Sequence, residues 1–266
     1  MKLRLFTGKD TAAAIAAARA ALGPEALVLE QRRVQGGVEI AAAVERAEEE
    51  APPVPDLLAR HGVAEPLARA LAASPLALPA RLRFGAVPEG PVMLVGPPGA
   101  GKTLAAIRLA TAALLAGRSP RVTSADARRA GGELLSLLAV LGLAPHAEAA
   151  SADIVDTAGI DVFDAASRAE LPKTDGARVL VLPADLDAAS AAETARAWRG
   201  WGCTHLVATR LDLSPRLGSL LAAADAGLVL ALASLSPATG AAMVPLTPAF
   251  LARRLASAPT RRRLDA

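Results

Sequence analysis

The chain has 266 residues, which is enough for one large or two modest domains with a sizeable core. Its net charge of +3 is too small to predict sequence-specific nucleic-acid binding, and its single cysteine excludes an internal disulfide and a cysteine metal cluster. No apolar run is long enough to cross a bilayer, and the first residues have too short an apolar core for a signal peptide. We therefore expect a cytoplasmic protein, and leave open a peripheral association with the inner face of the cell membrane.

Residues 1–46 are predicted to form a small amino-terminal domain. The pattern indicates a strand over residues 1–6, a helix that begins near Asp10 or Thr11 and ends at Leu22, and strands over 26–32 and 38–43. The sequence "QGG" between the last two strands is typical of a hairpin turn. We therefore expect the order β-α-β-β in this domain.

A connecting region follows this domain. The acidic, proline-ended stretch "ERAEEEAPPVP" predicts a linker over residues 47–55. Residues 56–90 are predicted to be a short helical region, with two helices separated at Gly62. The connecting region therefore leads into a larger domain that begins at residue 91.

Residues 91–258 alternate between short apolar strands and helices, and residues 259–266 form a basic tail. The predicted strands cover residues 92–95, 121–124, 153–155, 179–182, 205–208 and 228–232. This alternation predicts an α/β fold with a doubly wound, mostly parallel sheet. Because such sheets bind ligands at the carboxyl ends of their strands, functional residues are expected there.

The glycine-rich stretch "GPPGAGKT", from Gly96 to Thr103, is the most specific motif in the chain. It fits the G-x-x-x-x-G-K-[ST] pattern of a P-loop, which holds the phosphates of a nucleotide between a strand and a helix. The required strand precedes it, and residues 103–116 are predicted to form the helix. Lys102 would reach the β and γ phosphates, and we expect its side chain to face solvent when the site is empty.

The phosphate-binding amides are expected in the second half of this loop. Pro97 and Pro98 lack N–H groups, so the donors must follow them in the chain. They are therefore predicted to be the amides of Gly99, Ala100 and Gly101, with glycine allowing the backbone to turn around an anion.

Two further acidic motifs stand at predicted strand ends. In "DTAG", Asp156 can hold Mg²⁺ together with the Thr103 hydroxyl, and the Gly159 amide can meet the γ phosphate. In "TRLD", Asp212 can accept two hydrogen bonds from the N1–H and exocyclic amine of guanine. Adenine lacks this pair of donors, so Asp212 predicts binding of GTP or GDP rather than ATP.

A third strand-end motif, "DARRAGG", supplies candidate catalytic residues. Asp126 and Arg129 could position the attacking water and meet the γ phosphate. Each short motif alone is weak evidence. Three of them in order after a P-loop are much less readily explained by chance.

Together these motifs resemble the signal-recognition-particle (SRP) class of GTPases, and within it the flagellar FlhF family. "GPPGAGKT", "DARR", "DTAG" and "TRLD" match the P-loop and the D-T-x-R, D-T-A-G-R and T-K-L-D elements of the class. Leu217-Gly218 stands where FlhF proteins tend to carry Leu-Gly, and residues 1–46 resemble the FlhF amino-terminal domain. The resemblance adds Thr209 and Arg210 to Asp212 as guanine-binding residues.

The sequence departs from the class at several positions. Ile160 stands where the class has an arginine after D-T-A-G, and Leu135 where it has a glutamine near the γ phosphate. Ala127 and Arg210 replace a threonine and a lysine, and the stretch 126–156 is shorter than in the class. These changes concern hydrolysis and the dimer interface, whereas the residues for phosphate and base binding are retained.

The resemblance implies a GTP-binding protein of flagellar placement, assembly or protein targeting, with slow intrinsic GTP hydrolysis. It also implies GTP or GDP and Mg²⁺ as cofactors, a nucleotide-dependent homodimer, and a flagellar or membrane-associated protein partner. Two alternatives remain open: a catalytically degenerate nucleotide-binding scaffold that recruits other proteins, and an ATPase of another P-loop group. Asp212 argues against the second alternative.

Overall fold

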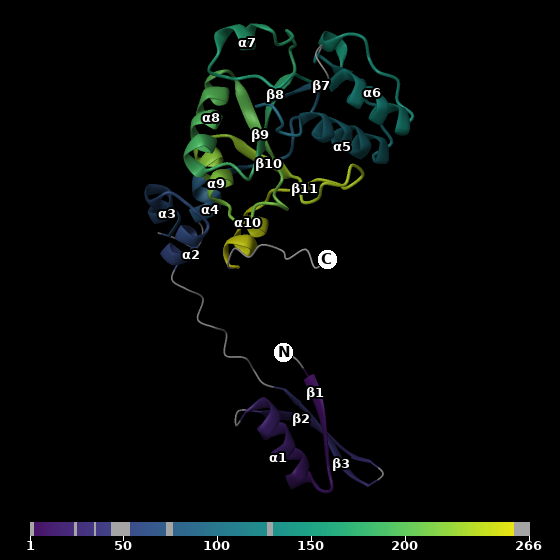
Figure 1. Cartoon of the computed structure of the whole chain (residues 1–266), viewed down its shortest axis with the longest axis vertical. Helices are drawn as coiled ribbons and strands as arrows, with labels where there is room; N and C mark the ends of the chain where they lie inside the picture. Colours follow the sequence, from purple (N-terminus) through teal and green to yellow (C-terminus); the bar gives the residue numbers. More distant parts are fainter. Residues whose placement is uncertain are drawn as a thin grey trace. The chain divides into compact units, whose positions relative to one another are not determined.

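The computed structural model (Figure 1) describes residues 3–23, 26–34, 36–43, 54–72, 77–126 and 130–257. The chain divides into two compact units, Met1–Pro52 and Pro53–Ala266. Arg129, residues 47–53 of the predicted linker and the basic tail 259–266 lie outside the described residues. None of the helices in the described ranges combines the length and apolar character that a bilayer crossing requires.

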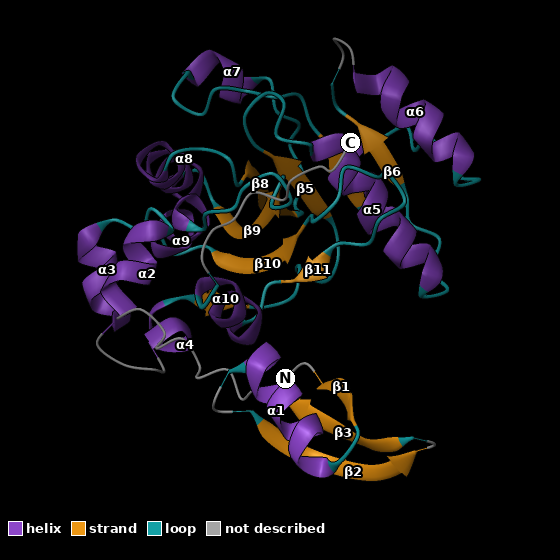
Figure 2. Cartoon of the chain, turned by 60° about the horizontal axis from the view of Figure 1, so that its bottom comes forward, coloured by secondary structure: helices purple, strands orange, loops and turns teal. Residues whose placement is uncertain are grey.

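The first unit has the predicted β-α-β-β order. Its elements are β1 (Leu3–Gly8), α1 (Thr11–Leu22), β2 (Leu27–Val34) and β3 (Gly37–Ala43). The strands form an antiparallel sheet in the order β1-β3-β2, and Figure 2 shows α1 lying across one face of it. Asp10 caps α1 by accepting a hydrogen bond of 2.8 Å from the Ala13 amide. The core under the helix combines the small side chains of Ala14 and Ala18 on α1 with the larger Ile40 on β3.

The second unit begins with three short helices, α2 (Val54–Arg60), α3 (Glu65–Ala72) and α4 (Ala77–Arg81). Val54 and Pro55, which we expected in the linker, form the first turn of α2, where a proline costs no intrahelical hydrogen bond. The region 56–90 is also not helical throughout. It contributes a short strand, β4 (Arg83–Phe84), which pairs in parallel with a strand much later in the chain.

The sheet of the second unit is mostly parallel, as predicted. Its other strands are β5 (Val92–Val95), β6 (Val122–Ser124), β7 (Ile154–Asp156), β8 (Ala177–Pro183), β9 (Cys203–Thr209), β10 (Val229–Ala233) and β11 (Val244–Pro245). The order is β11-β10-β9-β8-β5-β7-β6, with β4 attached to β10. Among the described strands of this second sheet, only β11 runs antiparallel to its neighbour. β5 lies between β8 and β7, so the chain leaves it on one side and returns on the other, which defines a doubly wound sheet.

Helices cover both faces of this sheet. They are α5 (Lys102–Leu115), α6 (Ala130–Val140), α7 (Ala165–Ala169), α8 (Ala188–Gly200), α9 (Gly218–Asp225) and α10 (Pro248–Leu255). Figure 1 shows α5 and α6 on one side of the sheet and α8 and α9 on the other. Leu94 packs in the core cluster on the α5 side, and the preceding residue, Met93, packs in the cluster that contains Trp198 of α8. Because alternate residues of a strand point to opposite faces, this two-sided burial explains why β5 is a continuous apolar run.

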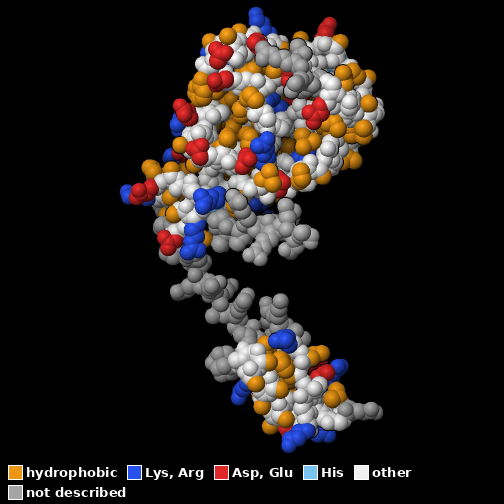
Figure 3. All heavy atoms as spheres, in the orientation of Figure 1, with side chains coloured by type: hydrophobic (Ala, Val, Ile, Leu, Met, Phe, Trp, Pro, Cys, Tyr) orange, Lys and Arg blue, Asp and Glu red, His pale blue; other side chains and the backbone are white. Residues whose placement is uncertain are grey.

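The outer surface of the second unit carries both signs of charge. On the face that Figure 3 shows, acidic and basic side chains are interspersed among exposed apolar ones. This agrees with the small net charge of the whole chain.

Candidate functional site

The fold brings the predicted motifs to one edge of the sheet. The glycine-rich loop connects β5 to α5, "DTAG" begins at the last residue of β7, and "TRLD" begins at the last residue of β9. The strands β7, β5, β8 and β9 are consecutive in the sheet and parallel. Their carboxyl ends therefore lie along one edge, where α/β sheets bind their ligands.

Glycine is required at two positions in this site, one because of its backbone angle and one because of a close contact. Gly101 has a φ of 84° and precedes α5, which has no side-chain cap at its amino terminus. A Cβ on Gly159 would lie 2.4 Å from the Cα of Pro98, so only glycine lets "DTAG" contact the loop this closely. The loop thus leaves helix-terminal N–H groups available for an anion.

Lys102 fills the loop in this structure. Its Nζ donates hydrogen bonds of 3.2 and 3.0 Å to the carbonyl oxygens of Gly96 and Pro97. The side chain is buried, so our expectation that it faces solvent is wrong: these carbonyls hold the ammonium inside the loop. Burial lowers the pKa of Lys102, while the negative charges of Asp156 and Asp126 oppose that shift.

Thr103 and Asp156 form a direct pair. The Thr103 hydroxyl donates a hydrogen bond of 2.7 Å to Oδ2 of Asp156. Asp156 is fully buried, and its Oδ1 has no hydrogen-bond partner in the described part of the chain. Burial raises the pKa of Asp156 to about 6, although Thr103 and Lys102 partly offset this effect. A buried carboxylate oxygen without a partner, beside a threonine hydroxyl, fits the hard oxygen donors that Mg²⁺ prefers.

A cavity of about 240 Å³ lies beside the glycine-rich loop. Asp212 lines it, together with Thr209 and Arg210 of the same motif. Thr209 donates a hydrogen bond of 2.7 Å from its hydroxyl to the Ala100 carbonyl, and Arg210 donates one of 2.7 Å to the Gly99 carbonyl. The motif is therefore bonded to the loop, with Asp212 at the wall of the adjoining cavity.

Arg108 of α5 also lines this cavity, and the sequence analysis missed it. The side chain is buried, and it donates hydrogen bonds of 2.7 and 2.6 Å to the carbonyls of Ser236 and Ala238, and another to the Ser234 hydroxyl. It thereby holds the segment after β10 against α5. The signal in the sequence was a lone arginine within the apolar helix "AAIRLA".

The candidate catalytic residues are only partly described. Asp126 follows β6 and is half-buried, and its negative charge acts to raise the pKa of both Lys102 and Asp156. Arg129 and Ala127 lie outside the described residues. Ile160 is only 5% exposed and packs in the core, and its amide donates to the Gly96 carbonyl at 3.3 Å. Leu135 lies on α6 and is 47% exposed. Neither side chain provides a charge or a hydrogen-bonding group.

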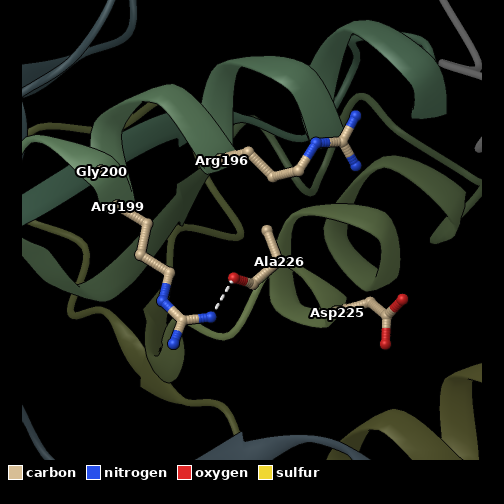
Figure 4. Close-up of a pocket in the computed structure, with 5 residues that line it drawn as sticks. All are labelled: Arg196, Arg199, Gly200, Asp225 and Ala226. Carbon is tan, nitrogen blue, oxygen red and sulfur yellow. Dashed lines mark hydrogen bonds between the residues drawn. The ribbon is translucent and has the colours of Figure 1, made fainter.

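Another hollow, of about 480 Å³, lies at the carboxyl ends of α8 and α9. Figure 4 shows Arg196 and Arg199 on α8, and Asp225 and Ala226 at the end of α9; Arg199 donates to the Ala226 carbonyl at 2.5 Å. The residues that line it include none of the strand-end motifs. We therefore assign the candidate site to the loop after β5.

The fold resembles that of solved GTPases. No protein-family model and no curated protein sequence matches the chain. A crystal structure of FlhF complexed with GTP and Mg²⁺ is 17% identical, with a TM-score of 0.63 over 77% of this chain and 98% of that chain. FlhF complexed with GMPPNP and Mg²⁺ is 19% identical, with the same TM-score and coverage. The signal recognition particle receptor FtsY from Elizabethkingia anophelis is 17% identical, with a TM-score of 0.55 over 76% and 83% of the two chains.

These similarities establish the class of fold. The chain has the P-loop NTPase fold in the form found in the SRP-type GTPases, as its motifs predicted. FlhF is the protein of that class to which two of these structures belong.

Proposed function

We propose that this chain is an FlhF-like GTP-binding protein of the SRP GTPase class. The observation that carries the proposal is the convergence of the P-loop, Asp156 and Asp212 at the carboxyl ends of neighbouring parallel strands. FlhF, whose fold is similar, has been crystallised with GTP and Mg²⁺. The same ligands suit the residues of this site.

Phosphate binding is assigned to the glycine-rich loop and the start of α5. The amides of Gly99, Ala100 and Gly101 and the amide of Gly159 would donate to phosphate oxygens. Lys102 would exchange its two carbonyl partners for the β and γ phosphates. The charge of the ammonium is better compensated by phosphate oxygens than by carbonyls, which favours this exchange.

The Thr103 hydroxyl and the Asp156 carboxylate would hold Mg²⁺ next to the phosphates. When bound, the ion neutralises phosphate charge. The described residues contain no cluster of three or more histidine, cysteine, aspartate or glutamate side chains that could hold a metal ion by themselves. The cation would therefore take most of its ligands from the nucleotide and from water, as Mg²⁺ does in nucleotide sites.

Guanine recognition is assigned to Asp212, with Thr209 and Arg210 beside it. The cavity at Asp212 adjoins the phosphate loop, as a base pocket must. A carboxylate accepts from N1–H and the exocyclic amine of guanine, and adenine does not offer this pair. Arg108 lines the same cavity, and its hydrogen bonds hold the segment after β10, which forms part of the cavity wall.

Hydrolysis is proposed to be slow. Asp126 and Arg129 are the candidate catalytic residues, but Ile160 and Leu135 are apolar where the class has an arginine and a glutamine. An arginine that meets the transferred phosphate contributes roughly 10³–10⁵ in rate. The absence of this arginine and of the glutamine also supports the second candidate function, a scaffold that binds nucleotide without cleaving it.

The biological role rests on the similarity to FlhF alone. We propose a role in flagellar placement, assembly or protein targeting, with a nucleotide-dependent homodimer and a flagellar or membrane-associated partner. Peripheral association with the inner face of the cell membrane belongs to the same proposal.

Calorimetry with GTP, GDP and ATP, with and without Mg²⁺, tests the nucleotide assignment. We expect GTP and GDP to bind in preference to ATP, and Asp212→Asn to shift the preference toward xanthine nucleotides, whose ring offers the complementary pattern. Asp175→Asn is the matched control, because Asp175 is exposed and lies outside the cavity. Equal competition by ATP against GTP in the unmodified protein would show that the base assignment is wrong.

A further inference from the structure

The strand β2 is an open edge of the sheet in the first unit. The sheet order is β1-β3-β2 (Figure 2), so β2 is paired on one side only, with β3. Residues 27–33 of this eight-residue strand are all exposed, and Val34 is partly buried. On its outer side β2 has no partner strand among the described residues. A long exposed edge of this kind is a template for pairing with another strand.

The edge strand carries charged side chains of both signs. Arg32 donates a hydrogen bond of 2.6 Å from Nε to Glu39 of β3, and its side chain is 65% exposed. A guanidinium has five N–H donors, so its terminal nitrogens can still bind a second carboxylate. Glu30 is exposed and has no ion pair within the described part of the chain. One free carboxylate and one partly used guanidinium therefore stand two residues apart on the edge.

Glu30 and Arg32 lie on the same face of the sheet. In the register with β3 they are opposite Ala41 and Glu39, which are also two positions apart. Ile40, between those two residues, packs in the core under α1. Because alternate residues of a strand point to opposite faces, Glu30 and Arg32 point away from α1. Their side chains therefore form one row on the open face of the sheet.

The order of charges on β2 selects one register for pairing two copies. Two identical antiparallel strands in one sheet are related by a two-fold axis perpendicular to the sheet, and at that axis one residue meets its own copy. An axis at Glu30, Arg32 or Arg33 would oppose two like charges, which is destabilising. Leu29 lies in a β-bulge, which disturbs regular pairing. An axis at Gln31 instead places Glu30 of each copy opposite Arg32 of the other.

We propose that two copies of this chain pair antiparallel through β2, about a two-fold axis at Gln31, and join their three-stranded sheets into one. Each Arg32 then lies between Glu39 of its own chain and the partner's Glu30, so that the charges alternate in sign across the joined sheet. The side chains that meet at the axis are uncharged amides. The contact lies in the unit Met1–Pro52, which contains none of the strand-end motifs, so it requires no nucleotide.

Sedimentation equilibrium of the full chain without nucleotide tests this pairing. We expect a reversible equilibrium between monomer and dimer at protein concentrations up to roughly 0.5 mM, because one strand from each copy makes an interface below the standard size. Glu30→Arg should weaken the dimer by about tenfold or more, since it turns both cross-strand pairs into pairs of like charge. Arg4→Glu, a charge reversal at an exposed position of β1, the other edge strand, should leave it unchanged. A chain that stays monomeric, or a dimer that Glu30→Arg does not weaken, would refute the proposal.

Mixing two charge-reversal variants tests the register directly. Glu30→Arg opposes arginines when it pairs with itself, and Arg32→Glu opposes glutamates. One copy of each restores both pairs of opposite charge, so an equimolar mixture should dimerise about as tightly as wild type. Circular dichroism shows whether Arg32→Glu, which loses its bond to Glu39, is folded. A folded mixture that remains monomeric would overturn the proposed register.

Cross-linking provides a test that leaves the charges in place. Gln31→Cys should form a disulfide-linked dimer under mild oxidation, because residue 31 meets its own copy at the axis. Thr7→Cys, at an exposed position of β1, should not, and the natural Cys203 is buried. Equal cross-linking of both variants would refute pairing through β2. A dimer that forms only with GTP would also refute it, because that dimer would belong to the nucleotide-dependent association proposed above.

Discussion

Asp156→Asn should stabilise the nucleotide-free protein at neutral pH. Asp156 is fully buried, and burial raises the pKa of its carboxyl from 3.8 to about 6. This difference corresponds to about 3 kcal/mol of free energy by which the ionised carboxylate destabilises the folded state. An asparagine side chain carries no charge to bury, and its oxygen can still accept the hydrogen bond from Thr103. For a domain of this size the gain corresponds to a rise in melting temperature of about 6–12 °C.

The effect should depend on pH in a definite direction. Between pH 3.8 and about 6, folded wild-type protein keeps a proton on Asp156 that the unfolded chain has released. The stability contributed by this group therefore falls as pH rises through that window. The asparagine of the variant cannot titrate, so the difference in stability between variant and wild type should be largest above about pH 6 and vanish below about pH 4.

Thermal and denaturant unfolding at pH 5.0 and 7.5, without nucleotide, measures this difference. The control is Asp153→Asn, in the loop just before the same strand. Hydrogen bonds and ion pairing with Arg121 lower the pKa of Asp153, so neutralising it should destabilise the protein at neutral pH. The Asp156 variant should at the same time lose Mg²⁺-dependent nucleotide affinity, which is the expected exchange of stability for function. A variant that is no more stable than wild type at pH 7.5 would refute the reasoning.

Three other predictions concern the phosphate loop, the hydrolysis step and the boundary between the two units. Lys102→Ala should abolish triphosphate binding with little change in the melting temperature. The variant loses two hydrogen bonds, but it no longer has to bury an ammonium group, and the two effects offset each other. An unchanged GTP affinity would show that the P-loop does not bind the phosphates. Leu135→Gln, at an exposed position, should fold normally, whereas Ile160→Arg should lower the free energy of unfolding by several kcal/mol because it buries a charge. In single-turnover GTPase assays, wild type and Leu135→Gln should both hydrolyse GTP slowly. Rapid hydrolysis by wild type would contradict the proposal of a weakened catalyst. Limited proteolysis should cut first between residues 45 and 55, where the sequence is acidic and rich in proline, and early cleavage inside the sheet of the second unit would contradict the predicted boundary.

The elements that the sequence predicted well are those with a strong local signal. The helix α1 ends at Leu22 as expected, and β5 covers the predicted residues 92–95, because capping residues, glycine and apolar periodicity act over a few neighbouring positions. The strands β4 and β11 were not predicted. Each has only two residues, which is too short for a periodic pattern, and each pairs with β10, which supplies its hydrogen-bonding partner.

The candidate site shows the same division. The strand-end motifs could be found because each is a short contiguous pattern, and their convergence followed from the rule for parallel sheets. Contacts between distant segments could not be found in this way. The bonds of Arg108 to the segment after β10 depend on which segments meet in three dimensions. The inward position of Lys102 depends on the loop carbonyls, which no residue pattern encodes.

The contacts within the site also give a reason to expect that this chain retains nucleotide binding while its hydrolysis is slow. The groups proposed for binding already hold one another: Thr209 is bonded to the Ala100 carbonyl, and Arg210 to the Gly99 carbonyl. A nucleotide would meet a formed loop, and the ordering cost of binding would be small. Hydrolysis needs more, since it requires charge and hydrogen bonds aimed at the transferred phosphate. At Ile160, where the resemblance implies an arginine, the chain has a side chain that packs in its core, so under the proposed function the same position would trade a charge near the phosphate for packing.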